Sequence, residues 1–174
     1  AAAIDRGEPL LLLYIVEPTL LRDPHYRGRH WHFIAQSLQA MNNELAMLGA
    51  QIHILEGEPV TLLNTLHQSQ PISHLYSHEE TGLGVTFERD RQVAAFCAAQ
   101  GIVWHEYQTN GIQRGRRDRR GWNRAWQRVM SDAEIPVDLN ALTQLCQAAP
   151  AAVEGAHSGR IEGWQQHNAA FQRG

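Results

Sequence analysis

The feature of this sequence with the clearest chemical potential is a run of arginines around residue 120. Seven of the fifteen basic residues fall within it: Arg114, Arg116, Arg117, Arg119, Arg120, Arg124 and Arg128. Trp122 and Trp126 lie among them. Guanidinium groups bind phosphate through paired hydrogen bonds and stack on aromatic faces, so the run could contact nucleic acid or a nucleotide phosphate. We favour the alternative, a solvated loop whose charges pair with Asp118 and with acids of a neighbouring domain.

The ten histidines do not have the spacing of a metal site. On a helix, the rings of His30 and His32 would point about 200° apart and could not share an ion. His78 and Glu79 follow a strand-like segment, whereas the metalloprotease motif needs a helix with a second histidine four residues further on. We therefore expect surface and loop histidines, and no metal.

The sequence carries no motif for nucleophilic catalysis or for a phosphate loop. Neither the Gly-x-Ser-x-Gly elbow nor the glycine-rich fingerprints of nucleotide-binding proteins occur. Cys97 lies among alanines and is expected to be a small packing residue. All fifteen basic residues are arginine, which excludes a lysine Schiff base and a Walker lysine in this chain. We predict no catalytic residue here.

Composition indicates one globular domain with a substantial core. The chain has 174 residues, of which 43% are hydrophobic and 19% charged, with a net charge of −3. That charge argues against nucleic-acid binding through overall charge. The longest apolar run, residues 9–16, is too short to span a membrane. Two cysteines without metal-ligand spacing fit a reducing compartment, so we expect a cytoplasmic protein without a membrane partner.

The elements that would position these side chains alternate along the chain. Apolar or alternating segments predict strands near residues 10–16, 51–56, 72–77 and 102–107. Amphipathic patterns predict helices between them, at residues 27–48, 58–68 and 87–100; Thr86 would cap the last and Gly101 would end it. Strands separated by helices predict an α/β fold, a Rossmann-like parallel sheet with helices on both faces in three layers.

The pattern changes after Tyr107. Residues 121–130 predict a short helix, and its stripe of Trp122, Trp126 and Val129 is expected to be buried. Residues 147–174 contain few large apolar side chains and are typical of a linker or tail. We therefore expect an α/β domain over residues 1–146, followed by a linker at 147–174 that leads to a further domain.

The order of these segments resembles the N-terminal antenna domain of the DNA photolyase and cryptochrome family. The resemblance covers nearly the whole chain, and it rests on order and spacing, since no single segment is a catalytic signature. The matching segments are PLLLLYIVEPTLL, RGRHWHFIAQSLQAM, LGAQIHILEGEP, ISHLYSHEETG, FERDRQVAAFCAAQGIVWHEY and RRGWNRAWQRVM.

Two features of the family are missing from the chain. Family members begin with a strand and a W-F-x-R-D-L-R-type segment, and residues 1–8 are similar to the end of the helix that follows it. The large C-terminal helical domain, which holds FAD and the DNA lesion in the family, is also missing. The chain thus resembles a fragment of a longer protein, and the missing first strand would be the central strand of the sheet.

The resemblance implies a domain that holds an antenna chromophore, either a folate, a deazaflavin or a flavin. Its expected walls are residues 17–27 and 77–88, at the carboxyl ends of the strands. Glu88 aligns with a carboxylate that contacts the folate antenna in some relatives, and His25 falls within a residue of another such contact. The alternative for Glu88 is an acid favoured by the dipole in the first turn of a helix.

The resemblance also implies what the full-length protein would do. It would be a light-driven lyase that splits pyrimidine dimers, with damaged DNA and its own C-terminal helical domain as partners. The present chain alone is not expected to be catalytic. One alternative is a cryptochrome-type blue-light photoreceptor without repair activity. Another is a stand-alone nucleotide-binding module, for which Glu17-Pro18-Thr19 would be a poor phosphate loop.

Overall fold

The structure is a computed structural model that describes residues 1–112, 114–115 and 118–151. These residues form two compact units. The first comprises Ala1–Gln70 and the described part of the chain from Val137 onward, and the second comprises Pro71–Pro136. Each unit contains a pair of parallel strands.

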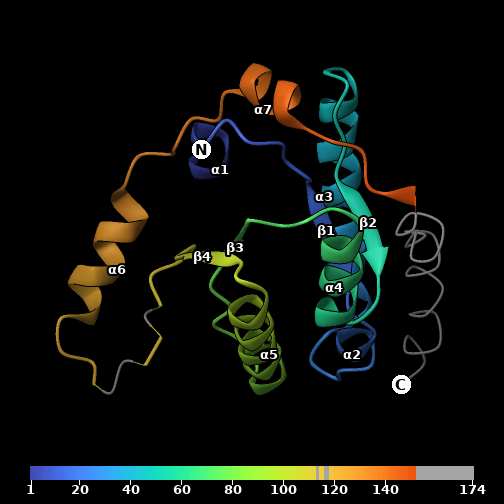
Figure 1. Cartoon of the computed structure of the whole chain (residues 1–174). Helices are drawn as coiled ribbons and strands as arrows, with labels where there is room; N and C mark the ends of the chain where they lie inside the picture. Colours follow the sequence, from blue (N-terminus) through green and yellow to red (C-terminus); the bar gives the residue numbers. More distant parts are fainter. Residues whose placement is uncertain (113, 116–117, 152–174) are drawn as a thin grey trace. The chain divides into compact units, whose positions relative to one another are not determined.

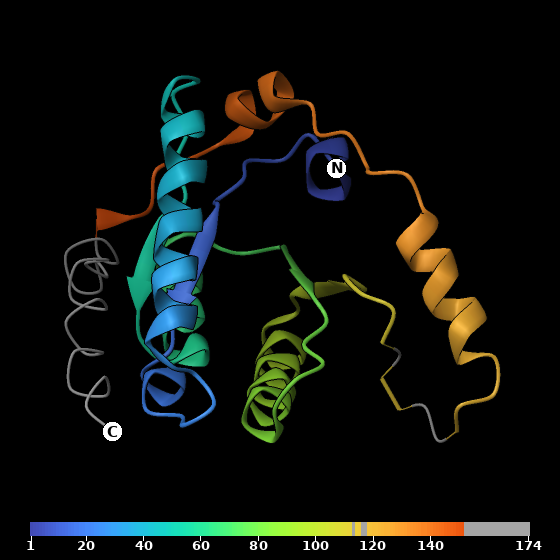
Figure 2. The same cartoon turned by 180° about the vertical axis from the view of Figure 1, so that it is seen from behind.

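In the first unit, a parallel strand pair lies between two helices. Its elements are α1 (Ala2–Asp5), β1 (Leu13–Val16), α2 (Pro18–Leu21), α3 (Gly28–Ala46), β2 (His53–Glu56), α4 (Pro59–Ser69) and α7 (Leu139–Leu145). In the pairing register, Leu13 lies opposite His53 and Val16 opposite Glu56. Figures 1 and 2 show α3 on one face of the β1–β2 pair and α4 on the other.

The core of this unit forms where α3 meets β1. Val16, Ala35 and Leu38 are buried together, and partly buried side chains such as Tyr14 and Ile34 pack against them. The helical period of the sequence accounts for most of the buried face of α3. Met41 is an exception, because the helical period places it three residues after the buried Leu38, whereas it is 51% exposed. On α4, Pro59 occupies the first turn, where its missing N–H costs no hydrogen bond.

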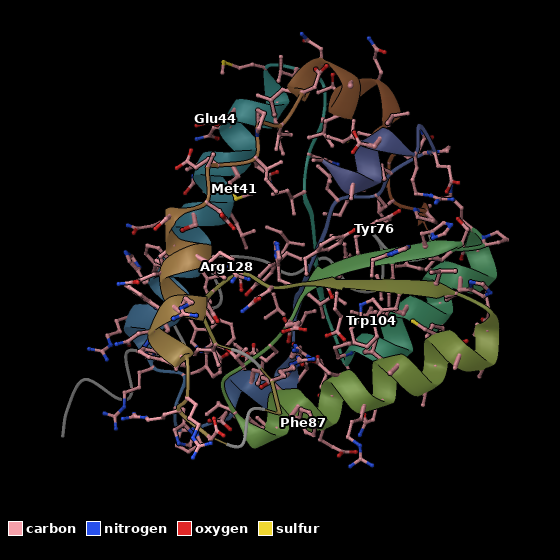
Figure 3. The ribbon with its side chains drawn as sticks, turned by 90° about the vertical axis from the view of Figure 1, so that its left-hand side faces the viewer. Met41, Glu44, Tyr76, Phe87, Trp104 and Arg128 are labelled. Carbon is pink, nitrogen blue, oxygen red and sulfur yellow. The ribbon has the colours of Figure 1, made fainter. Side chains whose placement is uncertain are left out.

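In the second unit, α5 (Gly84–Gln100) connects β3 (His74–His78) to β4 (Val103–Tyr107), and α6 (Trp122–Ser131) follows. The two strands pair in parallel. Trp104 lies between the strands and α5, where its Nε1 donates a 2.9 Å hydrogen bond to Ser77 Oγ. Tyr76 lies on the opposite face of the pair (Figure 3), and its ring stacks on His105. Side chains on both faces of the β3–β4 pair therefore make contacts within this unit.

Parallel pairing and helices on both faces of a strand pair confirm the predicted three-layer α/β class. All four predicted strands are present, each shorter than expected from its apolar run. The short helices α2 and α7 were not predicted, because four to seven residues are too few for a helical period to stand out. Leu10, at the start of the first predicted strand, instead forms an isolated parallel bridge with Cys146.

The start of α5 corrects the expected cap. The helix begins at Gly84, so Thr86 lies at its third position and Leu83 is the N-cap. Thr86 Oγ1 accepts the Leu83 N–H at 3.2 Å and donates to the Leu83 carbonyl at 2.7 Å. Thr86 thus caps the start of α5 from the third position of the helix, by bonding the backbone of the N-cap residue. The end agrees with the prediction, because Gly101 adopts the left-handed conformation at φ 70°.

The buried stripe predicted for α6 is wrong. Trp122 is 38% exposed and Trp126 is 40% exposed, and α6 has no buried residue. The two indole rings stack on each other, with centroids 6.2 Å apart. Within the described chain, no other helix or strand packs extensively on α6, so its two indoles stay partly exposed.

Candidate functional site

In the first unit, the segments that follow β1 and β2 are tied together. Open parallel sheets bind ligands outside the carboxyl ends of their strands, and these two segments begin there. The backbone N–H of Thr19 and its Oγ1 both donate to Glu58 Oε1, at 3.2 and 2.7 Å. The two hydrogen bonds hold α2 against the start of α4, which gives this edge of the unit a defined shape.

His25 lies in the loop between α2 and α3, with its side chain 68% exposed. The Asp23 carboxylate accepts its backbone N–H at 2.9 Å and lies 2.8 Å from its Nδ1. Hydrogen bonds from the backbone and then the ring of His25 lower the pKa of Asp23. Asp23 therefore fixes the orientation of an imidazole that is otherwise open to solvent.

In the second unit, Arg114 joins three segments around the carboxyl ends of β3 and β4. Its Nε donates to the Glu80 carbonyl at 2.6 Å, and its Nη1 donates to Glu106 Oε1 at 2.8 Å. Its Nη2 donates to Asp90, a residue of α5 that is only 8% exposed. Burial lowers the pKa of Arg114, but the hydrogen bonds and charges of Asp90 and Glu106 outweigh it, and the pKa is raised.

The loops on either side of this arginine are held by further hydrogen bonds. Glu80 Oε1 accepts the backbone N–H groups of Thr81 and Gly82 at 2.9 and 2.8 Å. Asn110 Nδ2 donates to Thr81 Oγ1 at 3.2 Å. The loop after β3 is therefore tied to the loop after β4.

Arg114 shows which acids neutralise part of the arginine run. Its partners lie within its own unit, 8 to 34 residues away in the sequence. No local spacing signals these partners, so the sequence did not reveal them. Arg116 and Arg117, which belong to the same run, lie outside the described residues.

Glu88 lies on α5, with its side chain 55% exposed, and pairs with Arg91 at 3.3 Å. Because α5 begins at Gly84, Glu88 lies in the second turn, and the alternative of a first-turn acid is wrong. His25 belongs to the first unit and Glu88 to the second. Their participation in one binding site stays a prediction.

Metal sites and activated thiols are two further kinds of chemistry that titratable groups can provide. In the described part of the chain, no group of three or more histidines, cysteines, aspartates and glutamates could hold a metal ion. Cys97 is 2% exposed, and burial raises the pKa of both Cys97 and Cys146, so neither thiol is activated. No helix among the described residues is long and apolar enough to cross a membrane.

Parallel strand pairs, with helices on both faces and ordered loops at the strands' carboxyl ends, define the Rossmann-like class of α/β domains. Within that class, the chain belongs to the DNA photolyase family, whose sequence profile matches residues 1–114. This confirms the resemblance drawn from the order of the segments. No curated protein was found to match the sequence.

A solved structure has the same fold. It is the crystal structure of an archaeal photolyase from Sulfolobus tokodaii with two FAD molecules, described as implying a novel light-harvesting cofactor. The TM-score is 0.67 at 15% sequence identity, and the match covers 95% of this chain. This chain spans 37% of the length of that photolyase.

Proposed function

We propose that this chain is the light-harvesting domain of a photolyase-type flavoprotein. It would hold a planar antenna chromophore at the carboxyl ends of its parallel strands. The family membership of residues 1–114 supports this proposal. The two FAD molecules of the Sulfolobus tokodaii photolyase, one implied to harvest light, are consistent with a flavin in that place; a folate and a deazaflavin are the other candidates.

The observation that carries the proposal is the exposure of the His25 and Glu88 side chains and the way a neighbour holds each of them. Each side chain is more than half exposed, and each is held by a single neighbour, Asp23 or Arg91. An oriented imidazole and an exposed carboxylate can hydrogen-bond the ring nitrogens and carbonyls that folates, deazaflavins and flavins share. When bound, such a pigment absorbs light and passes the excitation energy to FAD.

The remaining functions would belong to the rest of the protein. We assign no catalytic residue to this chain. FAD and damaged DNA would be bound by a C-terminal helical domain, and the complete protein would split pyrimidine dimers in the cytoplasm. The chain's own contribution would be to hold the pigment rigidly, through loops that Glu58 fixes in the first unit and Arg114 fixes in the second.

The test uses a reading frame that includes this chain and the helical domain. The protein is purified in the dark, and its pigment is extracted and identified as folate, deazaflavin or flavin. H25A and E88Q should each weaken pigment retention by about tenfold or more, the effect of losing a hydrogen bond to a charged group. H32A and E44Q are matched controls, because His32 and Glu44 are exposed residues of α3 outside the loops.

The action spectrum of flavin photoreduction, which is the rate of photoreduction at each wavelength of light, gives a second measurement. It should contain the absorption band of the pigment, and that band should shrink in H25A and E88Q but not in the controls. Full pigment retention in both variants would refute the site. Repair of a dimer-containing oligonucleotide under blue light separates a repair enzyme from a cryptochrome-type photoreceptor.

A further inference from the structure

The arginine-rich segment has a charge opposite to that of the rest of the chain. Residues 113–131 contain seven arginines and one aspartate, a formal charge of +6, whereas the whole chain carries −3. The other residues therefore carry −9 together. A positive segment on an acidic chain attracts anions locally, even though the net charge does not. The match to the profile of the DNA photolyase family covers residues 1–114.

An open hollow of about 370 Å³ lies at the start of α6. It is lined by Arg119, Gly121, Trp122 and Asn123. Gly121 is in the left-handed conformation at φ 69°, and the Trp122 N–H donates to the Arg119 carbonyl at 3.1 Å. This turn places a guanidinium, an indole and an amide around one hollow, whose volume is at the lower end of the range for small-ligand sites.

The groups that line the hollow are available to a ligand. Trp122 stacks on Trp126 but is 38% exposed, so part of its indole remains open to a ligand. Arg119 is exposed, and no carboxylate among the described residues pairs with it. Arg114 differs, because Asp90 and Glu106 neutralise it. The run therefore contains both a structural arginine and an unneutralised one.

We propose that this hollow binds single-stranded nucleic acid. A base would stack on Trp122, the adjoining phosphate would accept hydrogen bonds from Arg119, and the Asn123 amide would contact the edge of the base. Aromatic stacking combined with arginine contacts to the backbone is the general mode of single-strand recognition. The charge of the segment favours a polyanion, and the exposed indole favours one with bases. This proposal does not rest on the antenna function.

The chain offers matched control variants on the same helix. Arg124 is two residues beyond Trp122, which places it about 200° around α6, away from the hollow. It is exposed and carries the same charge as Arg119. Arg128, one turn further along α6 (Figure 3), likewise does not line the hollow. R124Q therefore removes the same charge from the segment without touching the proposed contacts.

The experiment measures the binding of labelled eight-nucleotide oligo-dT and oligo-rU to the full chain by fluorescence anisotropy, across a range of salt concentrations. W122A should weaken binding roughly 5- to 150-fold, the effect of losing one stacked base, and W122F should restore most of it. R119Q should lower the slope of log K against log salt by about 0.7, the value for one phosphate contact to a single strand. R124Q should change binding less than R119Q does.

Three results would overturn the proposal. Equal effects of R119Q and R124Q would mean diffuse attraction without a site. Unchanged binding in W122A, or equally tight binding of polyphosphate, would mean that no base stacks. A blue shift of tryptophan fluorescence with anionic vesicles, without oligonucleotide binding, would assign this surface to a membrane. Far-ultraviolet circular dichroism of each variant verifies that it is folded.

Discussion

At the scale of single residues, two arginines of the second unit show how burial decides the value of an ion pair. Arg114 and its partner Asp90 have side chains only 24% and 11% exposed, and Arg114 makes two further hydrogen bonds. Arg91 and Glu88 are 68% and 55% exposed and meet at 3.3 Å. Water screens the second pair and solvates either partner when it is left alone. Asp90 without Arg114 would instead be a largely buried carboxylate with Arg89 as its remaining ion-pair partner.

We predict that R114Q lowers the free energy of unfolding by about 1.5–3 kcal/mol, the range for hydrogen bonds to charged groups. R91Q should lower it by less than about 1 kcal/mol, since exposed pairs contribute little. Denaturant unfolding followed by circular dichroism measures both. Equal losses in the two variants would contradict the structural role of Arg114.

At the scale of elements, α6 is held by a close approach rather than by a buried face. A Cβ added to Gly111 would lie 2.2 Å from Trp126 Cδ1 and 3.0 Å from Trp126 Cα. The turn before it is held by Asn110, whose Oδ1 accepts the Ile112 N–H at 2.9 Å. Only glycine allows the helix to lie so close to this turn.

We predict that G111A displaces α6 and destabilises the second unit by about 1–3 kcal/mol, as overpacking usually does. The near-ultraviolet circular dichroism of the stacked Trp122–Trp126 pair should weaken at the same time. G84A is the control, because an added Cβ there meets nothing within 4 Å, and it should change stability by less than about 0.5 kcal/mol. An unchanged tryptophan signal in G111A would show that the turn does not position the helix.

At the scale of the whole molecule, the chain consists of two units, each with its own strand pair and buried side chains. In the first unit, Leu62 of α4 is fully buried and lies against Gly57, where an added Cβ would be 3.1 Å from Leu62 Cγ. In the second, Val93 of α5 is 5% exposed. A cavity in one unit should therefore lower mainly the stability of that unit.

We predict that L62A costs about 2–5 kcal/mol and that the loss is confined to the first unit. Hydrogen exchange should show faster exchange of the β1–β2 amides, with the β3–β4 amides unchanged. V93A should give the reverse pattern at a smaller cost. A uniform loss of protection in either variant would mean that the chain unfolds as one cooperative unit.

Much of the fold could be predicted because its signals are local. An apolar run such as residues 9–16 and the helical period of residues 27–48 depend only on neighbouring residues, and Gly101 marks a helix end wherever that helix packs. Alternating strands and helices then left parallel pairing as the expected arrangement. The order of these segments was also enough to reveal the family.

The sequence by itself thus determined the class of fold, the positions of the strands and the resemblance to photolyases, and it named His25 and Glu88 as candidates. Only the tertiary structure decided which acids Arg114 meets, and that the indoles of Trp122 and Trp126 stay exposed. The physical reason is that a periodic pattern states which side of a helix is apolar, but not whether another element covers it. Ion-pair partners likewise depend on how segments distant in sequence pack together.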